Sequence, residues 1–207
     1  MAAFLANVGV NSSHAARSRL FEDGTFELVP IPERLDWRPP MVRIKGRAVH
    51  LDPDLESPRP TYGDNCRRAG RAFSLRRAKP NDLIFFLARL CPVNGNAGFY
   101  LVGALEITEV LEDVTRDPGP GWWDANAHVL RARAGDKWDS FWIFRGTPKT
   151  RRFTRAIPFT RGDADAVFES AWRWRPTRSD LQTIGSYTRT VRRIEGPGEE
   201  WLRASLR

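Results

Sequence analysis

The chain has 207 residues, of which 41% are hydrophobic, and a formal net charge of +8. This length suits one domain with a sizeable core, and no apolar run approaches the roughly 18–20 residues that span a bilayer, which argues against a membrane protein. The two cysteines, Cys66 and Cys91, form no CxxC pair and follow no signal peptide, so we predict a cytoplasmic protein with reduced thiols.

The first predicted element is a strand over residues 4–10, which ends in a dense polar turn. All the side chains of this turn can donate or accept hydrogen bonds, and the end of a strand is a rigid support for binding residues. The turn therefore contains the first candidate base-binding residues, which are Asn11, Ser12, Ser13 and His14. The alternative is a turn whose side chains bond only the local backbone.

A second polar cluster comes after a hairpin predicted at Asp23-Gly24 and a surface loop over residues 33–45. It contains His50, Asp52 and Asp54. In an extended segment His50 and Asp52 point to the same face, an arrangement that suits a general base with its orienting carboxylate, or two metal ligands. The alternative is a proline-containing Asx turn in which His50 makes a structural bond.

A third polar cluster, with Tyr62, Asp64 and Asn65, leads directly into an arginine-rich run. We predict a short helix over residues 65–78 whose basic side chains follow phosphates. These basic side chains are Arg67, Arg68, Arg71, Arg76, Arg77 and Lys79. The alternative is a solvated basic face, which is the commoner meaning of a charge run. We expect the three polar clusters to line one cavity.

The centre of the chain is predicted to be a hairpin of two apolar strands, over residues 81–90 and 98–108, with a Gly/Asn loop between them. Both strands are apolar almost throughout rather than alternating, which is typical of strands buried on both faces. Gly103 interrupts the second strand and marks a bend or a close approach of another backbone.

The last part of the chain adds two groups of candidate residues. Trp122 and Trp123 follow a Pro/Gly loop and are candidates for stacking on a base beside His128, unless they close one end of the core. A strand over residues 140–146 leads into a basic turn with Lys149, Arg151 and Arg152, and a short strand follows over residues 156–160. Residues 164–174 have helical spacing, and the basic tail is predicted to pack back on the body.

None of the common cofactor, nucleotide, hydrolase or metal motifs tested occurs in the sequence: GxGxxG, GxxxxGK[ST], GxSxG, HExxH and the deaminase HxE…PCxxC pattern are absent. We therefore predict no cofactor and no metal. A mixed site of histidines and carboxylates is the alternative, since all three histidines lie in the polar clusters.

Several short segments together resemble the third of the nucleotide modification associated domain families. They are SRLFEDG (18–24) with PIPE (30–33), HLDPD (50–54), YGD (62–64), DLIFF (82–86), GFYLVG (98–103), NAH (126–128) and GTPKTR (146–151). The resemblance implies a role around modified nucleotides and leaves binding and catalysis both open. The central hairpin is also similar to the strands of the PUA, ASCH and EVE group, whose barrels support an aromatic pocket for a base.

We predict a single α+β domain, residues 1–207, with a curved or barrel-like mixed sheet and peripheral helices. Its core spans roughly residues 4–160, and a C-terminal helix and basic tail occupy residues 161–207. The predicted partner is nucleic acid, with DNA favoured over RNA, or a modified nucleotide; no membrane is expected and the oligomeric state stays open.

The first functional hypothesis is recognition of a modified or flipped base, with a basic face on phosphates and a polar and aromatic pocket on the base. An enzyme on the same ligand, such as a glycosylase or other hydrolase, is the alternative, and an interaction module is the second alternative. The candidate catalytic residues are His50, Asp52 and Asp64. The base-binding candidates are Asn11, Ser12, Ser13, His14, Asp54, Tyr62, Asn65, Trp122, Trp123 and His128. The phosphate-binding candidates are Arg67, Arg68, Arg71, Arg76, Arg77, Lys79, Lys149, Arg151 and Arg152.

Overall fold

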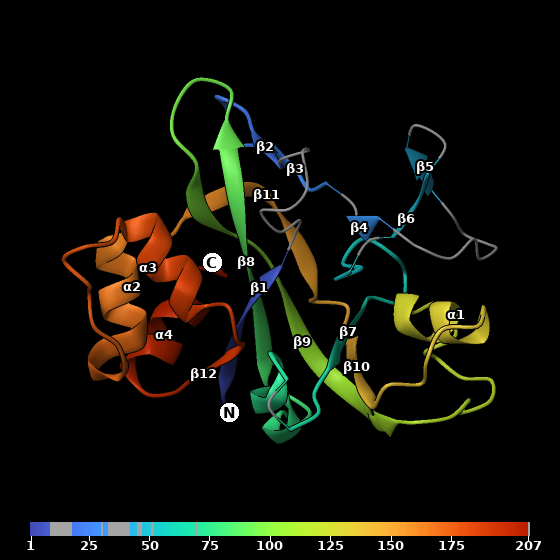
Figure 1. The fold of residues 1–207 in the computed structure, drawn as a ribbon. Helices are drawn as coiled ribbons and strands as arrows, with labels where there is room; N and C mark the ends of the chain where they lie inside the picture. Colours follow the sequence, from blue (N-terminus) through green and yellow to red (C-terminus); the bar gives the residue numbers. More distant parts are fainter. Residues whose placement is uncertain are drawn as a thin grey trace.

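The computed structural model describes residues 1–8, 18–29, 31–32, 42–44, 47–50, 52–68 and 70–206, with side chains for all of these except 31–32, 42–44, 47–50 and 171. In this part of the chain a mixed sheet of nine strands forms the centre of the molecule. Helices lie at its two sides (Figure 1). The strands of this sheet are β1 (Ala3–Val8), β2 (Arg19–Leu20), β3 (Phe26–Glu27), β7 (Thr61–Asn65), β8 (Leu83–Pro92), β9 (Gly98–Val114), β10 (Phe141–Gly146), β11 (Arg151–Pro158) and β12 (Arg192–Ile194).

The sheet is open and curved rather than closed into a barrel. Its main path runs β12-β1-β8-β9-β10-β7, while β11 pairs with β9, and β2 pairs with β3 and β8. Strand β8 is parallel to β1 and β2, and the other pairs are antiparallel. A second sheet has the order β4-β6-β5, from β4 (Ile31–Pro32), β5 (Val42–Ile44) and β6 (Arg47–His50). The predicted α+β class with a curved mixed sheet is confirmed.

The predicted central hairpin is confirmed as β8 and β9, which pair from Leu83 with Glu106 to Leu90 with Gly98. Alternate residues of β8 enter two different hydrophobic clusters, because successive side chains of a strand point to opposite faces. The strand is therefore buried on both faces, as its apolar sequence predicts. Gly103 marks a close approach of β11: a Cβ there would lie 2.8 Å from the carbonyl oxygen of Arg151.

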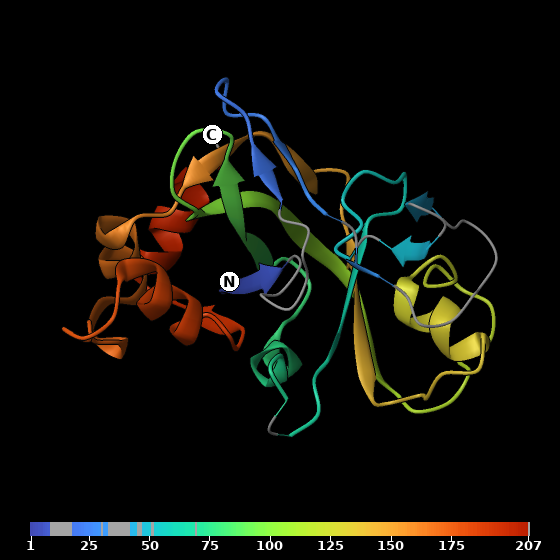
Figure 2. The ribbon, with the colours of Figure 1, turned by 45° about the horizontal axis from the view of Figure 1, so that its top comes forward.

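One side of the sheet carries the C-terminal helices α2 (Arg161–Phe168), α3 (Asp180–Tyr187) and α4 (Pro197–Ala204), and Figure 2 shows the same grouping from a second direction. Their cluster includes Leu5, Phe85 and the fully buried Leu202. The helix predicted over residues 164–174 ends earlier, at Phe168, and a 3₁₀ turn follows as η2 (Glu169–Ala171).

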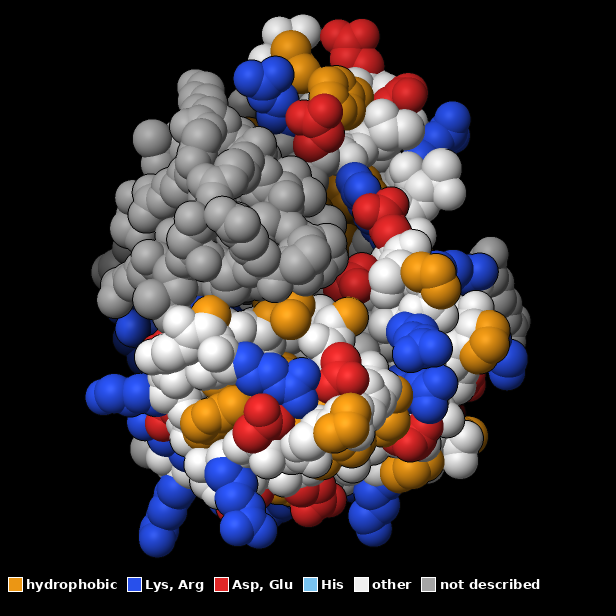
Figure 3. All heavy atoms as spheres, turned by 90° about the vertical axis from the view of Figure 1, so that its right-hand side faces the viewer, with side chains coloured by type: hydrophobic (Ala, Val, Ile, Leu, Met, Phe, Trp, Pro, Cys, Tyr) orange, Lys and Arg blue, Asp and Glu red, His pale blue; other side chains and the backbone are white. Residues whose placement is uncertain are grey.

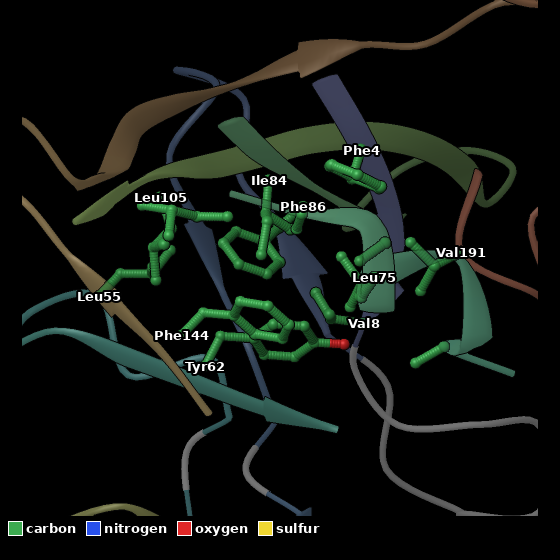
Figure 4. Close-up of a cluster of buried hydrophobic side chains, with 14 of the residues drawn as sticks. Phe4, Val8, Leu55, Tyr62, Leu75, Ile84, Phe86, Leu105, Phe144 and Val191 are labelled. Carbon is green, nitrogen blue, oxygen red and sulfur yellow. The ribbon is translucent and has the colours of Figure 1, made fainter. Parts of the chain in front are cut away.

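The second hydrophobic cluster lies between the sheet and η1 (Phe73–Arg77), a 3₁₀ helix with the buried Leu75. Figure 4 shows Tyr62, Phe86 and Phe144 meeting in this cluster. The rings of Tyr62 and Phe144 stack with centroids 6.4 Å apart, and Phe86 meets Tyr62 edge to face at 5.1 Å.

The third cluster lies under α1 (Ala127–Arg133), a helix that the sequence analysis did not predict. Val129 of α1 packs there against Phe141 and Ile143 of β10. Trp122 and Trp123 lie against the same cluster with their rings edge to face, 5.3 Å apart.

Candidate functional site

Strand β7 separates the polar residues that the sequence places side by side. Because side chains alternate along a strand, Tyr62 and Asp64 point to one face, and Gly63 belongs to the other. Each face of β7 carries a polar network of its own, and the two networks contain most of the described candidate residues of the second and third clusters.

The first network is built around the carboxylate of Asp64. One of its oxygens, Oδ2, accepts hydrogen bonds from the Tyr62 hydroxyl at 2.6 Å and from Nε and Nη2 of Arg71 at 2.9 and 2.8 Å. The other oxygen, Oδ1, accepts the backbone N–H of Asn65 at 2.8 Å. We call Tyr62, Asp64 and Arg71 the Asp64 network. Charge-assisted bonds of this kind hold a guanidinium in one orientation.

The Asp64 network runs from the core to the surface. The ring of Tyr62 is buried in the hydrophobic cluster, and its hydroxyl points out of that cluster (Figure 4). The side chain of Asp64 is 12% exposed and that of Arg71 is 48% exposed. Burial, and next the nearby carboxylate of Asp64, raise the pKa of Tyr62 well above its ordinary value, so the phenol stays protonated and donates to Asp64.

The neighbouring Cys66 is not a nucleophile. Its thiol is fully buried, and its sulfur lies 3.5 Å from the carbonyl oxygen of Asp64. Burial raises the pKa of this thiol above its ordinary value, so the thiolate that would attack an electrophile is not formed at neutral pH.

Arg71 belongs to the basic segment, residues 67–79, whose six candidate Arg and Lys residues are all exposed. The segment is tied to the body by the N–H of Val191, which donates to the carbonyl of Arg71 at 2.7 Å. The hydroxyl of Ser74 donates back to the carbonyl of Val191 at 2.8 Å. Arg67 forms an ion pair with Asp139 at 3.1 Å, an exposed pair that salt weakens. The predicted helix over residues 65–78 is confirmed only as the 3₁₀ helix η1.

The second network joins Asp52 to His128, although the two residues are far apart in the chain. Oδ2 of Asp52 lies 3.3 Å from Nε2 of His128, and Oδ1 of Asp52 accepts the N–H of Gly63 at 3.2 Å. Nδ1 of His128 lies 3.5 Å from Nη2 of Arg131. Because Arg131 can only donate, Nδ1 is the ring atom that can accept in this contact. We call this the Asp52–His128 pair.

The N-terminus of α1 brings His128 to the sheet. Asn126 caps this helix by accepting the N–H of His128 at 3.0 Å, and its amide donates to the hydroxyl of Thr61 at 3.0 Å. Gly63 makes this contact sterically feasible, since a Cβ on it would lie 2.5 Å from Cδ2 of His128. The helix cap therefore also positions the imidazole.

The other base-binding candidates lie in local or structural contacts. Asp54 accepts the N–H of Ser57, three residues further along the chain, at 3.2 Å, and Asn65 donates to Asp139 at 2.7 Å. Trp122 and Trp123 are partly buried against the third cluster. The surface over α1 shows acidic and basic side chains interspersed rather than one basic patch (Figure 3).

The basic turn after β10 lies apart from the basic segment in the fold, at the start of β11. Lys149 is 83% exposed and lies 3.8 Å from Glu106. Arg152 pairs with Glu56 at 3.2 Å and stacks over the ring of Phe26, and Arg151 donates to the carbonyl of Leu206. All three of these arginine and lysine residues therefore already have partners within the chain.

Some candidate residues lie outside the described part of the structure. Asn11, Ser12, Ser13 and His14 lie outside the described residues, and of His50 only the backbone is described, paired with Ile31. That the three polar clusters line one cavity thus stays a prediction for these residues. The described members fall into the Asp64 network and the Asp52–His128 pair.

Three residues that contact the candidate residues were not predicted from the sequence, namely Arg131, Phe73 and Trp142. The guanidinium carbon of Arg76 lies 5.9 Å from the ring centroid of Phe73 and 5.5 Å from that of Trp142. An aromatic residue inside an arginine run was the available signal for Phe73. Arg131 carried no such signal, because its role depends on α1.

Among the described residues, no group of three or more His, Cys, Asp or Glu side chains is arranged to hold a metal ion. Nor does any helix in the described ranges have the length and apolar character that crossing a membrane requires.

Comparison with known proteins gives one extensive match. Residues 3–203 match the model of a protein family described as nucleotide modification associated domain 3. No curated protein matches. Among solved structures, the chain is similar to human THYN1 protein in complex with 5-methylcytosine-containing DNA, at 16% identity and a TM-score of 0.43, covering 100% of this chain and 98% of that chain. It is also similar to the DUF55 domain of human thymocyte nuclear protein 1, at 17% identity and a TM-score of 0.40, covering 83% and 96%. Structural similarity of this degree does not by itself assign a function.

Proposed function

The chain belongs to the nucleotide modification associated domain 3 family, and from this premise we propose that it binds nucleic acid and recognises a modified or flipped base. DNA is the favoured partner. The basic segment holds the phosphates, and polar side chains of the domain read the base. The polar turn with Asn11 and His14, which follows β1 in the sequence, is the proposed source of these side chains.

The observation that carries the proposal is the orientation of Arg71. Asp64 binds Nε and Nη2 of its guanidinium, and the carbonyl of Asn7, near the end of β1, accepts from Nη1 at 3.3 Å. The side chain nevertheless stays half exposed. An arginine that is held in place by a carboxylate loses little conformational freedom when it meets a phosphate. The other exposed arginines of the basic segment add charge along the same path.

A salt series on labelled DNA tests the phosphate contacts. We expect the logarithm of the binding constant to fall with the logarithm of salt concentration with a slope of about −3 to −6, from roughly 0.7–0.9 per phosphate contact. Arg71→Gln should make the slope shallower by about one contact, whereas Lys137→Gln, an equal loss of charge in the loop after α1, should not. A wild-type slope near zero contradicts nucleic-acid binding and favours an interaction module.

A panel of oligonucleotides with one modified cytosine, adenine or thymine tests base recognition. We expect at least tenfold tighter binding for one modification than for the unmodified sequence, equivalent to about 1.4 kcal/mol. Equal binding across the panel, with the salt slope intact, would retain nucleic-acid binding and reject recognition of a modified base.

Hydrolysis is the second candidate function, and the Asp52–His128 pair is the observation that favours it. A carboxylate paired with an imidazole occurs in general-base sites, where the second ring nitrogen takes the proton; here that nitrogen, Nδ1, lies beside Arg131 and would have to be released from it. Incubation of the same oligonucleotides followed by mass spectrometry tests this function. We expect any product to disappear in Asp52→Asn and His128→Gln while binding persists. If no modified oligonucleotide is converted, the pair is structural.

A further inference from the structure

Phe73 is the one exposed aromatic side chain in the described part of the chain. It is 44% exposed, whereas the other aromatic residues with described side chains are buried or partly buried. The ring is not needed to hold the 3₁₀ helix η1 in place, since Leu75 is the buried residue of that helix. A single exposed apolar side chain is common on protein surfaces, so the meaning of this one depends on the groups around it.

The ring lies within a strongly cationic segment. Arg67, Arg68 and Arg71 precede it, and Arg76, Arg77 and Lys79 follow it, all exposed. The guanidinium of Arg76 lies over the ring of Phe73 and also over the ring of the buried Trp142. A cation held against an exposed ring strengthens the attraction of that ring for an anionic ligand that carries a flat π-system. The positive charges around it attract a polyanion rather than an apolar protein surface.

We infer that Phe73 and Arg76 form a stacking platform for an unpaired base of a single-stranded or locally opened nucleic acid. The inference rests on the proposed function and deepens it by naming the strand state. A base inside a duplex has both faces covered by its neighbours, so it cannot stack on a side chain unless it is extruded. Every base has a π-face, so this platform adds affinity without selecting a sequence.

Substitution of Phe73 tests the platform on matched DNA probes, a single-stranded 12-mer and the same sequence closed into a hairpin duplex. Phe73→Ala should weaken binding of the single strand about 5- to 150-fold, from about 1–3 kcal/mol for each stacked base. The salt slope should stay unchanged, because no phosphate contact is lost. Phe73→Tyr should bind like the wild type, and Phe73→Leu should bind like Phe73→Ala.

The matched control is Val93→Ala, since Val93 is another exposed apolar residue, 62% exposed against 44% for Phe73, at the tip of the central hairpin. It should leave binding within twofold of the wild type. Thermal melting of each variant shows that the folded fraction is the same. The inference is wrong if Val93→Ala weakens binding of the single strand as much as Phe73→Ala does. It is also wrong if Phe73→Ala weakens binding of the duplex and of the single strand equally.

Photocrosslinking gives an independent readout. A single strand with one 5-iodouracil should crosslink under long-wavelength ultraviolet light to the tryptic peptide of residues 72–76, which contains Phe73. Crosslinks confined to other peptides would reject the platform. If the wild type binds no nucleic acid at all, the proposed function itself fails. If it binds with a normal salt slope and Phe73→Ala binds equally well, only the platform fails.

Discussion

Asp64 determines how two other side chains are oriented. It accepts a hydrogen bond from the hydroxyl of a buried tyrosine and hydrogen bonds from the guanidinium of a half-exposed arginine. We therefore propose an indirect role for Asp64 in binding: it positions Arg71 and does not have to touch the ligand. This distinguishes it from Asp52, whose carboxylate faces an imidazole.

A double-mutant cycle tests this positioning role. Asp64→Asn keeps the shape but removes the charge, and we expect it to lower the free energy of unfolding by about 1–3 kcal/mol and to weaken DNA binding. In the Arg71→Gln background the same change should cause no further loss of affinity, because the residue that it positions is gone. Additive losses of affinity would show that Asp64 acts on the ligand by itself.

Tyr62 should make the protein sensitive to alkali. Its pKa is raised in the folded state, chiefly by burial, while the unfolded chain has the ordinary value of about 10. Above that pH the unfolded state loses the proton and the folded state keeps it, so the free energy of unfolding falls as pH rises beyond about 10. Below pH 10 this residue adds no pH dependence.

Urea unfolding at a series of pH values measures this effect. Tyr62→Phe should reduce the fall in the free energy of unfolding that the wild type shows above about pH 10. In the absorbance titration at 295 nm, the same variant should lack a tyrosine component that the wild type shows well above pH 10. If the missing component titrates near pH 10, the buried hydroxyl has no raised pKa and the Asp64 network is looser than described.

Between elements, the contact of α1 with β7 depends on Gly63. The helix cap Asn126 and the ring of His128 occupy the space where a side chain at Gly63 would lie, at 3.0 and 2.5 Å from an added Cβ. The basic segment depends on its neighbours in the same way, because its backbone is bonded to Val191 next to β12. Each polar network therefore requires two elements that are remote in sequence.

Gly63→Ala should lower the free energy of unfolding by about 1–3 kcal/mol, the usual cost of forcing extra volume into a packed site. Gly162→Ala is the matched control, since a Cβ there meets only the Thr160 hydroxyl, at 3.9 Å, and alanine favours a helix. Urea denaturation measures both. Equal stability of Gly63→Ala and the wild type would mean that α1 moves away at little cost.

At the scale of the whole molecule, the C-terminal helices share a core with the central sheet. Leu202 of α4 is fully buried in the cluster that contains Leu5 of β1 and Phe85 of β8. Strand β12 also adds directly to the edge of β1. We therefore predict that residues 161–207 unfold together with the rest of the chain as one domain.

Leu202→Ala should destabilise the whole protein by about 2–5 kcal/mol, because it leaves a cavity in this shared core. Glu200→Ala, an exposed change in the same helix, should alter stability by less than about 0.5 kcal/mol. Hydrogen exchange followed by mass spectrometry should show faster opening of peptides from β8 and from α4 alike. If exchange quickens only in the helices, the C-terminal part is a separate unit.

The amino-acid sequence by itself determined the local and strongly patterned features. The central hairpin could be predicted because its strands are adjacent in the chain, apolar throughout and joined by a Gly/Asn turn. Residue type and order also predicted that another backbone comes close to Gly103 and that the basic segment is exposed. The family was recognisable because its short motifs occur in the expected order over most of the chain.

Only the tertiary structure decided which polar residues act together. Tyr62 and Gly63 are neighbours in the chain but belong to opposite faces of β7, because side chains alternate along a strand. Arg71 lies on the face of Tyr62 and Asp64, and His128 lies against Gly63; both come from other parts of the chain. The partnership of Asp52 with His128 depends on where α1 docks, and the exposure of Phe73 depends on which side of η1 packs inward. Such choices are set by the packing of distant segments against a shared core, which local propensity and spacing do not encode.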